Sequence, residues 1–265
     1  MFTTARGPYL AAHHSAKGLS VRGAAEDAFL QNRMVHALSA EERARLLPSM
    51  QRVSLALGQV IYEPGTRLDH AYLPTTSIVS SIYTTQEGAT AQMALIGNEG
   101  VAGIELFLDH NTAHYRTVVQ IAGEAIKAPA KPLQAEFARG GLFQRAILRY
   151  SHSLLAQLAQ TAVCNRLHSV EQRLCRWLLE CDDRVNGNQI QMTQENIANM
   201  MGVRREGVTV AAGRLQDAGL IQYSRGHIHI LDRQGLDAIG CECYRVVEQE
   251  VNSAPMSSQP ARVVR

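Results

Sequence analysis

The sequence predicts an α+β protein in which a β jelly roll is followed by a long helix and a winged helix-turn-helix. Between Arg52 and Pro132, short β-branched runs alternate with turn signals at intervals of about ten residues, which favours a sandwich or jelly roll. From Leu133 to Asn252 there is no proline, and apolar residues recur with a helical period. The sequence therefore changes from strands to helices near residue 133.

We divide the 265 residues into five segments. They are a flexible arm (1–28), a β domain (29–140), a long helix (141–167), a helix-turn-helix domain (168–252) and a disordered tail (253–265). The arm mixes Gly, Ala, Ser and His without period, and neither it nor any other segment contains the continuous apolar run of a membrane span.

The cysteines and the charge point to an intracellular protein without an obvious polyanionic partner. All five cysteines lie in the second half, in no pattern of a secreted disulfide framework, so we expect reduced thiols and a cytoplasmic location. The net charge is only +2. From residue 165 onward, however, all twelve basic residues are arginines, whose planar guanidinium groups suit phosphates and guanine edges.

A long helix is expected over residues 141–167. Its apolar side chains recur every three or four residues and form one stripe: Phe143, Ile147, Tyr150, Leu154, Leu158 and Ala162. The stripe packs either on its own β domain or on a second copy of the chain. The length of the segment favours a homodimer.

A helix pair joined by a tight turn is expected next. After a helix from Ser169 to about Cys181 and a break at residues 186–188, the Thr193 hydroxyl is placed to cap a short helix. Gly202-Val203 supplies the turn, and a second helix begins near Arg204. Residues 219–232 then read as two short strands around Arg225-Gly226, which form a wing.

The second helix has two chemically different faces. At 100° per residue, small and apolar side chains share the buried face: Val208, Ala211 and Leu215. Groups able to contact base edges in a major groove share the opposite face or its margin: Arg205, Glu206, Thr209, Val210 and Gln216. Further residues are placed for phosphates: Thr193, Gln194, Arg204 and Arg225. The sequence thus predicts a DNA-binding protein.

The chain resembles the bacterial cyclic-AMP receptor protein / fumarate-nitrate regulator (CRP/FNR) family. SVEQRLCRWLLECDDR, MTQENIANMMGVRREGVTV and LQDAGLIQYSRGHIHILD carry this resemblance, and LGQVIYEPGT extends it to the β domain. The resemblance implies a dimeric transcriptional regulator that binds a palindromic double-stranded operator and RNA polymerase. Arg205 and Glu206 match the family's base-reading pair and Thr193 its backbone-contacting threonine. Val210 stands where the family often has a second base-reading arginine.

The resemblance also implies a cyclic-nucleotide-binding-like roll, from which this sequence departs at one position. Gly103, Arg116 and Thr117 match the family's nucleotide-binding residues, but Ile104 replaces the ribose-binding glutamate. Glu105 is one residue late and is expected to point the other way. The missing acceptor should weaken binding by about 1.5 to 3 kcal/mol, so we do not expect cyclic AMP as the effector.

We expect neither an iron–sulfur cluster nor another metal cofactor. In this family a cluster needs N-terminal cysteines, and residues 1–163 contain none. His110 and His114 lack a third ligand. Cys241 and Cys243 alone lack the ligands for tetrahedral zinc, and an ordinary helix surface is the expected setting for them.

Two other classes of protein are alternatives. A cupin-like metal enzyme needs His-x-His inside the roll, but His227 and His229 form the one such pair in the chain and lie in the predicted wing. The other alternative is a scaffold that never touches DNA. The exposed polar face around Arg205 argues against it. We therefore expect a regulator that is not an enzyme.

Overall fold

The computed structural model describes residues 27–185, 187 and 189–252. The tail predicted over 253–265 and most of the arm predicted over 1–28 lie outside the described residues. At the end of that arm, residues 27–29 are helical. None of the helices in the described part of the chain is long and apolar enough to cross a membrane.

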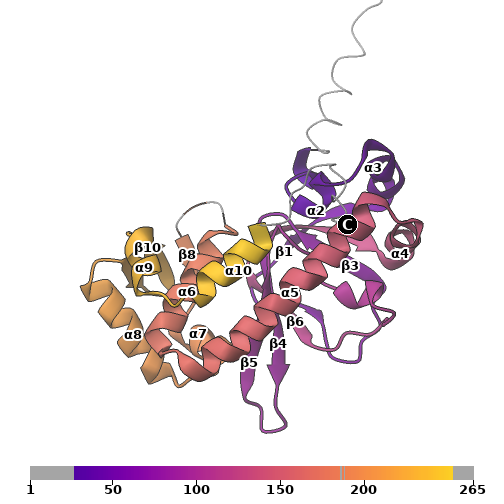
Figure 1. The fold of residues 1–265 in the computed structure, drawn as a ribbon. Coiled ribbons are helices and arrows are strands. Elements are labelled where there is room, and N and C mark those ends of the chain that lie inside the picture. The colour runs from indigo at the N-terminus through magenta and orange to yellow at the C-terminus, as the bar shows by residue number, and fades with distance from the viewer. Residues whose placement is uncertain (1–26, 186, 188, 253–265) are drawn as a thin grey trace, which may run out of the picture.

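The β domain is a roll of two antiparallel sheets, as predicted (Figure 1). One sheet has the order β1-β7-β3, formed by Gln51–Leu55, Gly123–Pro129 and His70–Pro74. The other has the order β2-β6-β4-β5, formed by Val60–Tyr62, Arg116–Ile121, Ile78–Thr84 and Thr90–Ile96. Small and branched side chains such as Ala71, Val79 and Ile126 fill the space between the sheets.

Short helices close the roll. The N-terminal ones are α2 (Arg33–His36), α3 (Ala40–Leu46) and the 3-10 turn η1 (Leu47–Ser49). A second 3-10 turn, η2 (Ile104–Phe107), follows Gly103, whose φ of 95° suits glycine. Helix α4 (Ala130–Arg139) then leads to Gly140, where the chain turns into the long helix.

The long helix α5 (Gly141–Leu167) forms as predicted, but the predicted stripe packs on its own β domain in its first half. Phe143, Ile147 and Tyr150 are buried in the core of the roll, and Leu154 packs against that core. The expectation that this stripe meets a second chain is therefore wrong for these residues. A helical period shows that a face is buried, and here the roll is close enough to cover it.

A different face of α5 is exposed. Leu148, Leu155, Ala159 and Ala162 are separated by seven, four and three residues, so they form one seam along the helix. Leu155 is 65% exposed, which is high for an apolar side chain. We call these four residues the α5 seam.

The C-terminal domain contains the predicted winged helix-turn-helix. Its helices are α6 (Val170–Asp182), α7 (Gln194–Met201) and α8 (Arg205–Asp217). The wing is a three-stranded antiparallel sheet in the order β8-β10-β9, formed by Gln189–Gln191, His227–Ile230 and Ile221–Ser224. Strand β8 was not predicted, because three residues after a glycine break carry too little pattern to identify a strand.

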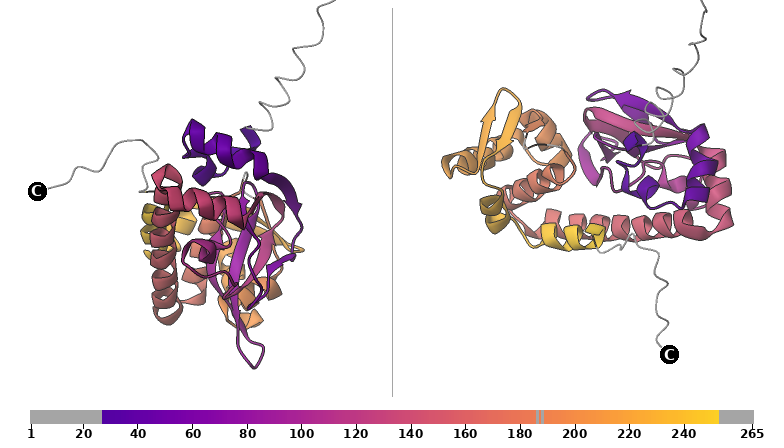
Figure 2. Two further views of the ribbon diagram at one scale, coloured as in Figure 1. Left: turned by 90° about the vertical axis from the view of Figure 1, so that its right-hand side faces the viewer. Right: turned by 90° about the horizontal axis from the view of Figure 1, so that it is seen from above.

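Two further helices complete the domain and return to the long helix. After α9 (Arg233–Ile239), helix α10 (Cys243–Asn252) lies alongside α5, where Ser153 Oγ donates to the carbonyl of Glu250 over 3.0 Å. Seen from above, α5 runs along one side of both domains (Figure 2). The C-terminal domain is thus attached to α5 at both of its ends.

The C-terminal domain also docks on the roll. Arg184 donates to Glu99 over 2.8 Å, and both side chains are at most 7% exposed. Thr90 Oγ1 donates to the carbonyl of Asn199 over 3.1 Å, which ties α7 to the β4–β5 hairpin. Ile78 and Leu95 of the roll share a core with the helix-turn-helix.

Candidate DNA interface

The turn between α7 and α8 is built by local sequence signals. Thr193 is the N-cap of α7 and accepts a hydrogen bond from the amide of Asn196 over 3.2 Å. Glu195 lies in the first turn, where its charge is favourable at the helix N-terminus. Gly202 ends α7 with a φ of 62°, a conformation that glycine adopts without strain. The predicted capping and turn are confirmed.

The buried face of α8 is the predicted one. Val208, Ala211 and Leu215 are at most 4% exposed and pack against α6 and α7 in the core of the domain. This packing fixes the rotation of α8 about its own axis. The opposite face must then point to solvent.

The exposed face of α8 carries the predicted base-reading side chains. Arg205, Glu206, Thr209, Val210 and Gln216 are all exposed. Thr209 Oγ1 donates to Gln194 Oε1 over 2.7 Å, and Arg205 Nε lies 4.0 Å from Glu195 Oε2. Both contacts join α8 to the first turn of α7. We call Arg205, Glu206, Thr209 and Val210 the α8 face.

Val210 is 55% exposed, so it is not packed against the domain core. It lies beside Glu206, Gly207 and Arg214 along a shallow groove that also includes the start of α6. Arg214 is held at 3.1 Å from Glu171, on the far margin of this groove. A larger side chain at position 210 therefore has room.

The residues predicted to contact phosphate lie at the edges of the same surface. Arg204 is the N-cap of α8, and its side chain makes no capping hydrogen bond. Arg225 and Gly226 form the turn of the β9–β10 hairpin with φ values of 51° and 81°, and Arg225 is exposed. Gly226 lies next to Thr193, so the wing and the cap of α7 are neighbours.

The predicted effector residues are only partly brought together. Gly103, Ile104, Glu105 and Thr117 line a cavity of about 50 Å³ between the roll and α5, which Leu154 and Leu158 close. Ligand sites usually measure about 300 to 1,000 Å³, so this cavity has room for a few waters and none for a nucleotide.

Two details of this cavity differ from the prediction. Ile104 and Glu105 line the same cavity, because they lie on a 3-10 turn and not on a strand, so the expectation that Glu105 points the other way is wrong. Arg116 is exposed and lies 3.3 Å from Glu63, outside the residues that line the cavity. Its setting is that of a surface ion pair.

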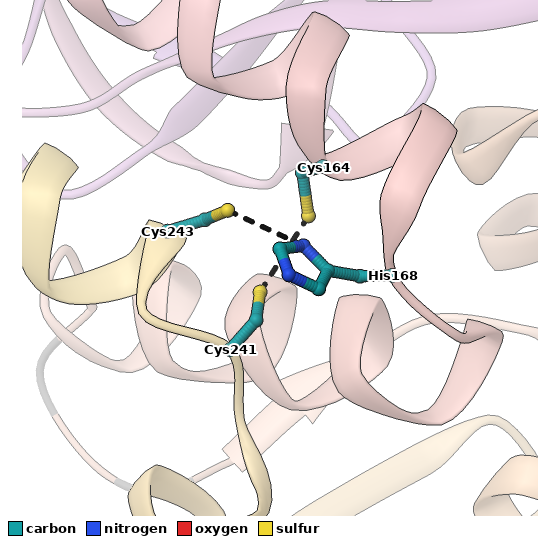
Figure 3. A group of neighbouring side chains, drawn as sticks. All are labelled: Cys164, His168, Cys241 and Cys243. Carbon is teal, nitrogen blue, oxygen red and sulfur yellow. Dashed lines mark hydrogen bonds between the residues drawn. The ribbon is translucent and has the colours of Figure 1, made fainter.

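A cluster that the sequence analysis missed lies where α5 meets the C-terminal domain (Figure 3). Cys164, His168, Cys241 and Cys243 bring one sulfur or nitrogen atom each within 4.8 Å of one another. The expectation that Cys241 and Cys243 lie on a helix surface is wrong, since both are buried. The hydrogen bond from the Cys241 thiol lowers the pKa of Cys164, and Arg176 and His168 act in the same direction.

The other histidines considered in the sequence have ordinary settings. His110 is exposed and lies 2.8 Å from Thr112 Oγ1, and His114 stacks edge-on against Tyr115. His227 and His229 lie on β10 of the wing, outside the roll, so they do not form a cupin site.

Comparison with known proteins agrees with this geometry. Residues 172–239 match the model of the Crp-like helix-turn-helix domain. FixK2 of Bradyrhizobium japonicum has a TM-score of 0.63 at 17% identity, over 72% of this chain and 98% of its own. A CRP/FNR-family regulator of Thermus thermophilus has a TM-score of 0.58 at 22% identity, over 71% and 97%. No curated protein sequence gives a significant match.

A third similar structure is CLP of Xanthomonas campestris, described as a regulator responsive to c-di-GMP, with a TM-score of 0.57 at 18% identity. It covers 72% of this chain and 99% of its own. These structures share the fold with this chain. The chain therefore contains a Crp-like helix-turn-helix domain within a fold that is similar to that of solved CRP/FNR regulators.

Proposed function

We propose that the protein acts as a homodimer that reads a palindromic DNA operator through α8. The observation that carries this proposal is the α8 face, whose polar groups are exposed while the opposite side of the helix is locked in the core. Arg205 would bind guanine O6 and N7, Glu206 the amino group of cytosine, and Thr209 a neighbouring base. The buried side of α8 carries two small side chains, Ala211 and Ala212.

Residues around the α8 face would contact the DNA backbone. Thr193 and Gln194 stand at the N-terminus of α7, where the helix dipole attracts phosphate. Arg204 begins α8, and Arg225 projects from the wing. Such contacts position the protein on the duplex and carry no base information.

Dimerisation would use the α5 seam. Its heptad-like spacing suits a second copy of the same helix packed in parallel, and burial of Leu148 and Leu155 would remove apolar surface from water. A two-fold axis along α5 would present two α8 helices to successive major grooves about 34 Å apart.

The roll would act as a sensor or a scaffold without cyclic AMP in the usual mode. Three features support this: Ile104 in place of a carboxylate, the cavity of about 50 Å³, and the surface ion pair of Arg116 with Glu63. We propose no enzymatic role. The five free cysteines fit a cytoplasmic regulator, for which RNA polymerase is the natural protein partner.

Electrophoretic mobility shift with genomic fragments at a fixed, stated salt concentration tests the proposal. We expect discrete complexes on a subset of fragments that survive excess nonspecific DNA. Equal binding to all fragments, or none, would show that α8 does not read sequence.

A further inference from the structure

The cluster of Cys164, His168, Cys241 and Cys243 has the composition of a tetrahedral metal site. Three sulfurs and one imidazole nitrogen form a complete set of four ligands for Zn²⁺, which prefers thiolate and imidazole. Each part of the cluster alone is incomplete. Cys164 and His168 come from the end of α5, Cys241 lies just before α10, and Cys243 is the first residue of α10.

The distances suit a single ion. Zn–S bonds of about 2.3 Å and a Zn–N bond of about 2.0 Å place two sulfurs about 3.8 Å apart, and a sulfur and a nitrogen about 3.5 Å apart. Cys164 Sγ and Cys241 Sγ are 3.6 Å apart, and Cys243 Sγ is 3.4 Å from His168 Nδ1. A polynuclear cluster would hold its terminal ligands farther apart, because several metal atoms would stand between them.

The surroundings orient the ligands as in a metal centre. His168 turns Nδ1 toward the sulfurs, while its Nε2 lies 3.5 Å from Glu242 Oε1. In metal-ligating histidines, the N–H of the second ring nitrogen commonly donates a hydrogen bond to a carboxylate. Gln160 Nε2 donates to Cys243 Sγ over 3.0 Å, which stabilises a thiolate. The four side chains of the cluster thus point toward one another (Figure 3).

We propose that Cys164, His168, Cys241 and Cys243 bind one Zn²⁺ ion per chain and that this ion locks the joint between α5 and the DNA-binding domain. The joint consists of His168 and Ser169, which are extended between two helices. On binding, thiols that carry protons release them to solvent as Zn–S bonds form. No electron transfer is involved.

The position of the site determines what the ion would do. Cys164 and Cys241 are 77 residues apart in the chain, and the intervening segment contains α6, the helix-turn-helix and the wing. An ion bound between them would close this loop. It would thereby fix the orientation of the DNA-binding domain, and of α8 within it, relative to α5. This regulatory consequence rests on the proposed DNA-binding function, whereas metal binding itself does not.

Cobalt titration of the full-length, reduced, chelator-treated protein tests the site. We expect one Co²⁺ per chain, a thiolate charge-transfer band, the strong visible bands of four-coordinate cobalt, and their loss when Zn²⁺ is added. Cys164→Ser, Cys241→Ser and Cys243→Ser should weaken or change these bands. Cys175→Ser, at a buried cysteine outside the cluster, should leave them unchanged.

Glu242→Gln gives a milder test that does not disturb the buried core, since Glu242 is 73% exposed. We expect a loss of metal affinity of about 10- to 100-fold, as for other carboxylates behind a ligating histidine. Absence of tetrahedral bands in the reduced wild type would overturn the proposal. So would formation of a Cys164–Cys241 disulfide in a protein that binds no metal when reduced.

A mobility shift on the same samples separates the two proposals. With Zn²⁺ we expect tighter DNA binding than after chelation, and no such difference in Cys241→Ser. If cobalt binds but the affinity for DNA is the same with and without metal, the metal site is confirmed and its proposed regulatory role is wrong. If the protein binds DNA but takes up no metal, the proposed DNA-binding function stands and the proposed metal site is wrong.

Discussion

Thr209 Oγ1 donates a hydrogen bond to Gln194 Oε1 over 2.7 Å, which joins the middle of α8 to the first turn of α7. Gln194 is a proposed phosphate contact and Thr209 a proposed base contact. Because the two side chains hold one another, the spacing between backbone and base contacts is already set in the free protein. Less side-chain freedom is then lost when DNA binds.

The first prediction concerns Arg205. Arg205→Ala should remove sequence preference at a cost of about 1 to 3 kcal/mol per half-site, because a bidentate contact to guanine is lost. Much of the nonspecific, salt-sensitive affinity should remain. Titration of specific and scrambled DNA at several salt concentrations measures both the sequence preference and the nonspecific affinity.

Arg214→Ala is a matched control for Arg205→Ala. Arg214 lies on the same helix and is 68% exposed against 65% for Arg205, but it pairs with Glu171 of α6 and is not one of the proposed base contacts. It should preserve sequence preference. Equal loss of preference in both variants would contradict the assignment of Arg205.

The second prediction separates capping from phosphate binding at Thr193. Thr193→Ala should lower stability by about 1 kcal/mol through the lost cap and should weaken binding to all sequences alike. Thr193→Asp keeps an N-cap acceptor but adds a negative charge. It should melt like the wild type yet bind DNA poorly, and normal binding by this variant would show that Thr193 does not face phosphate.

The third prediction concerns the α5 seam. Leu155→Arg should convert a dimer into a monomer at micromolar concentration, because two like charges that meet across the two-fold axis cannot replace an apolar contact at the centre of the seam. Light scattering measures the mass. Leu108→Arg changes an exposed leucine of the roll, 55% exposed, and should leave the mass unchanged. A monomeric wild type would refute the dimer.

The two faces of α8 were predictable because a local period decides them. Val208 and Thr209 are adjacent in sequence, yet one is buried and the other exposed, as the helical repeat requires. The same period on α5 identified Phe143, Ile147 and Tyr150 as buried but assigned them the wrong partner. It also placed the exposed Ala162 on the same stripe. Whether Phe143 meets the roll or a second chain depends on tertiary packing, which no local pattern contains.

The metal-ligand cluster was not predictable for a related reason. Cys164 and His168 are four residues apart and therefore share a helix face, which was a usable local signal. Cys241 and Cys243 are 77 or more residues away from Cys164, and only the return of α10 along α5 brings the pairs together. Docking of the helix-turn-helix on Ile78 and Leu95 of the roll has the same non-local origin.

The fourth prediction concerns cyclic AMP. Calorimetry with cyclic AMP up to millimolar concentration should show no saturable site, and DNA binding should not require the nucleotide. The cavity of about 50 Å³ is too small, and Ile104 offers no acceptor. A micromolar isotherm would refute this prediction, and loss of that isotherm in Glu105→Ala would show that Glu105 takes the ribose contact.

The last prediction concerns Val210, at the margin of the α8 face. With Arg205 as the long cation of that face, each half-site should contain one strongly required G·C pair. The base next to Val210 should be tolerant or mildly favour thymine, whose methyl group can contact valine. Selection from a randomised oligonucleotide pool measures both preferences.

Val210→Arg should sharpen selection at that neighbouring position toward guanine, because a guanidinium offers two hydrogen bonds that valine lacks. Since Val210 is 55% exposed beside an open groove, the substitution should not lower the melting temperature. The variant and the wild type are therefore compared in the same selection, with melting curves for both. If two equally stable proteins selected the same motif, position 210 would not face DNA, and α8 would have to enter the groove at a different rotation.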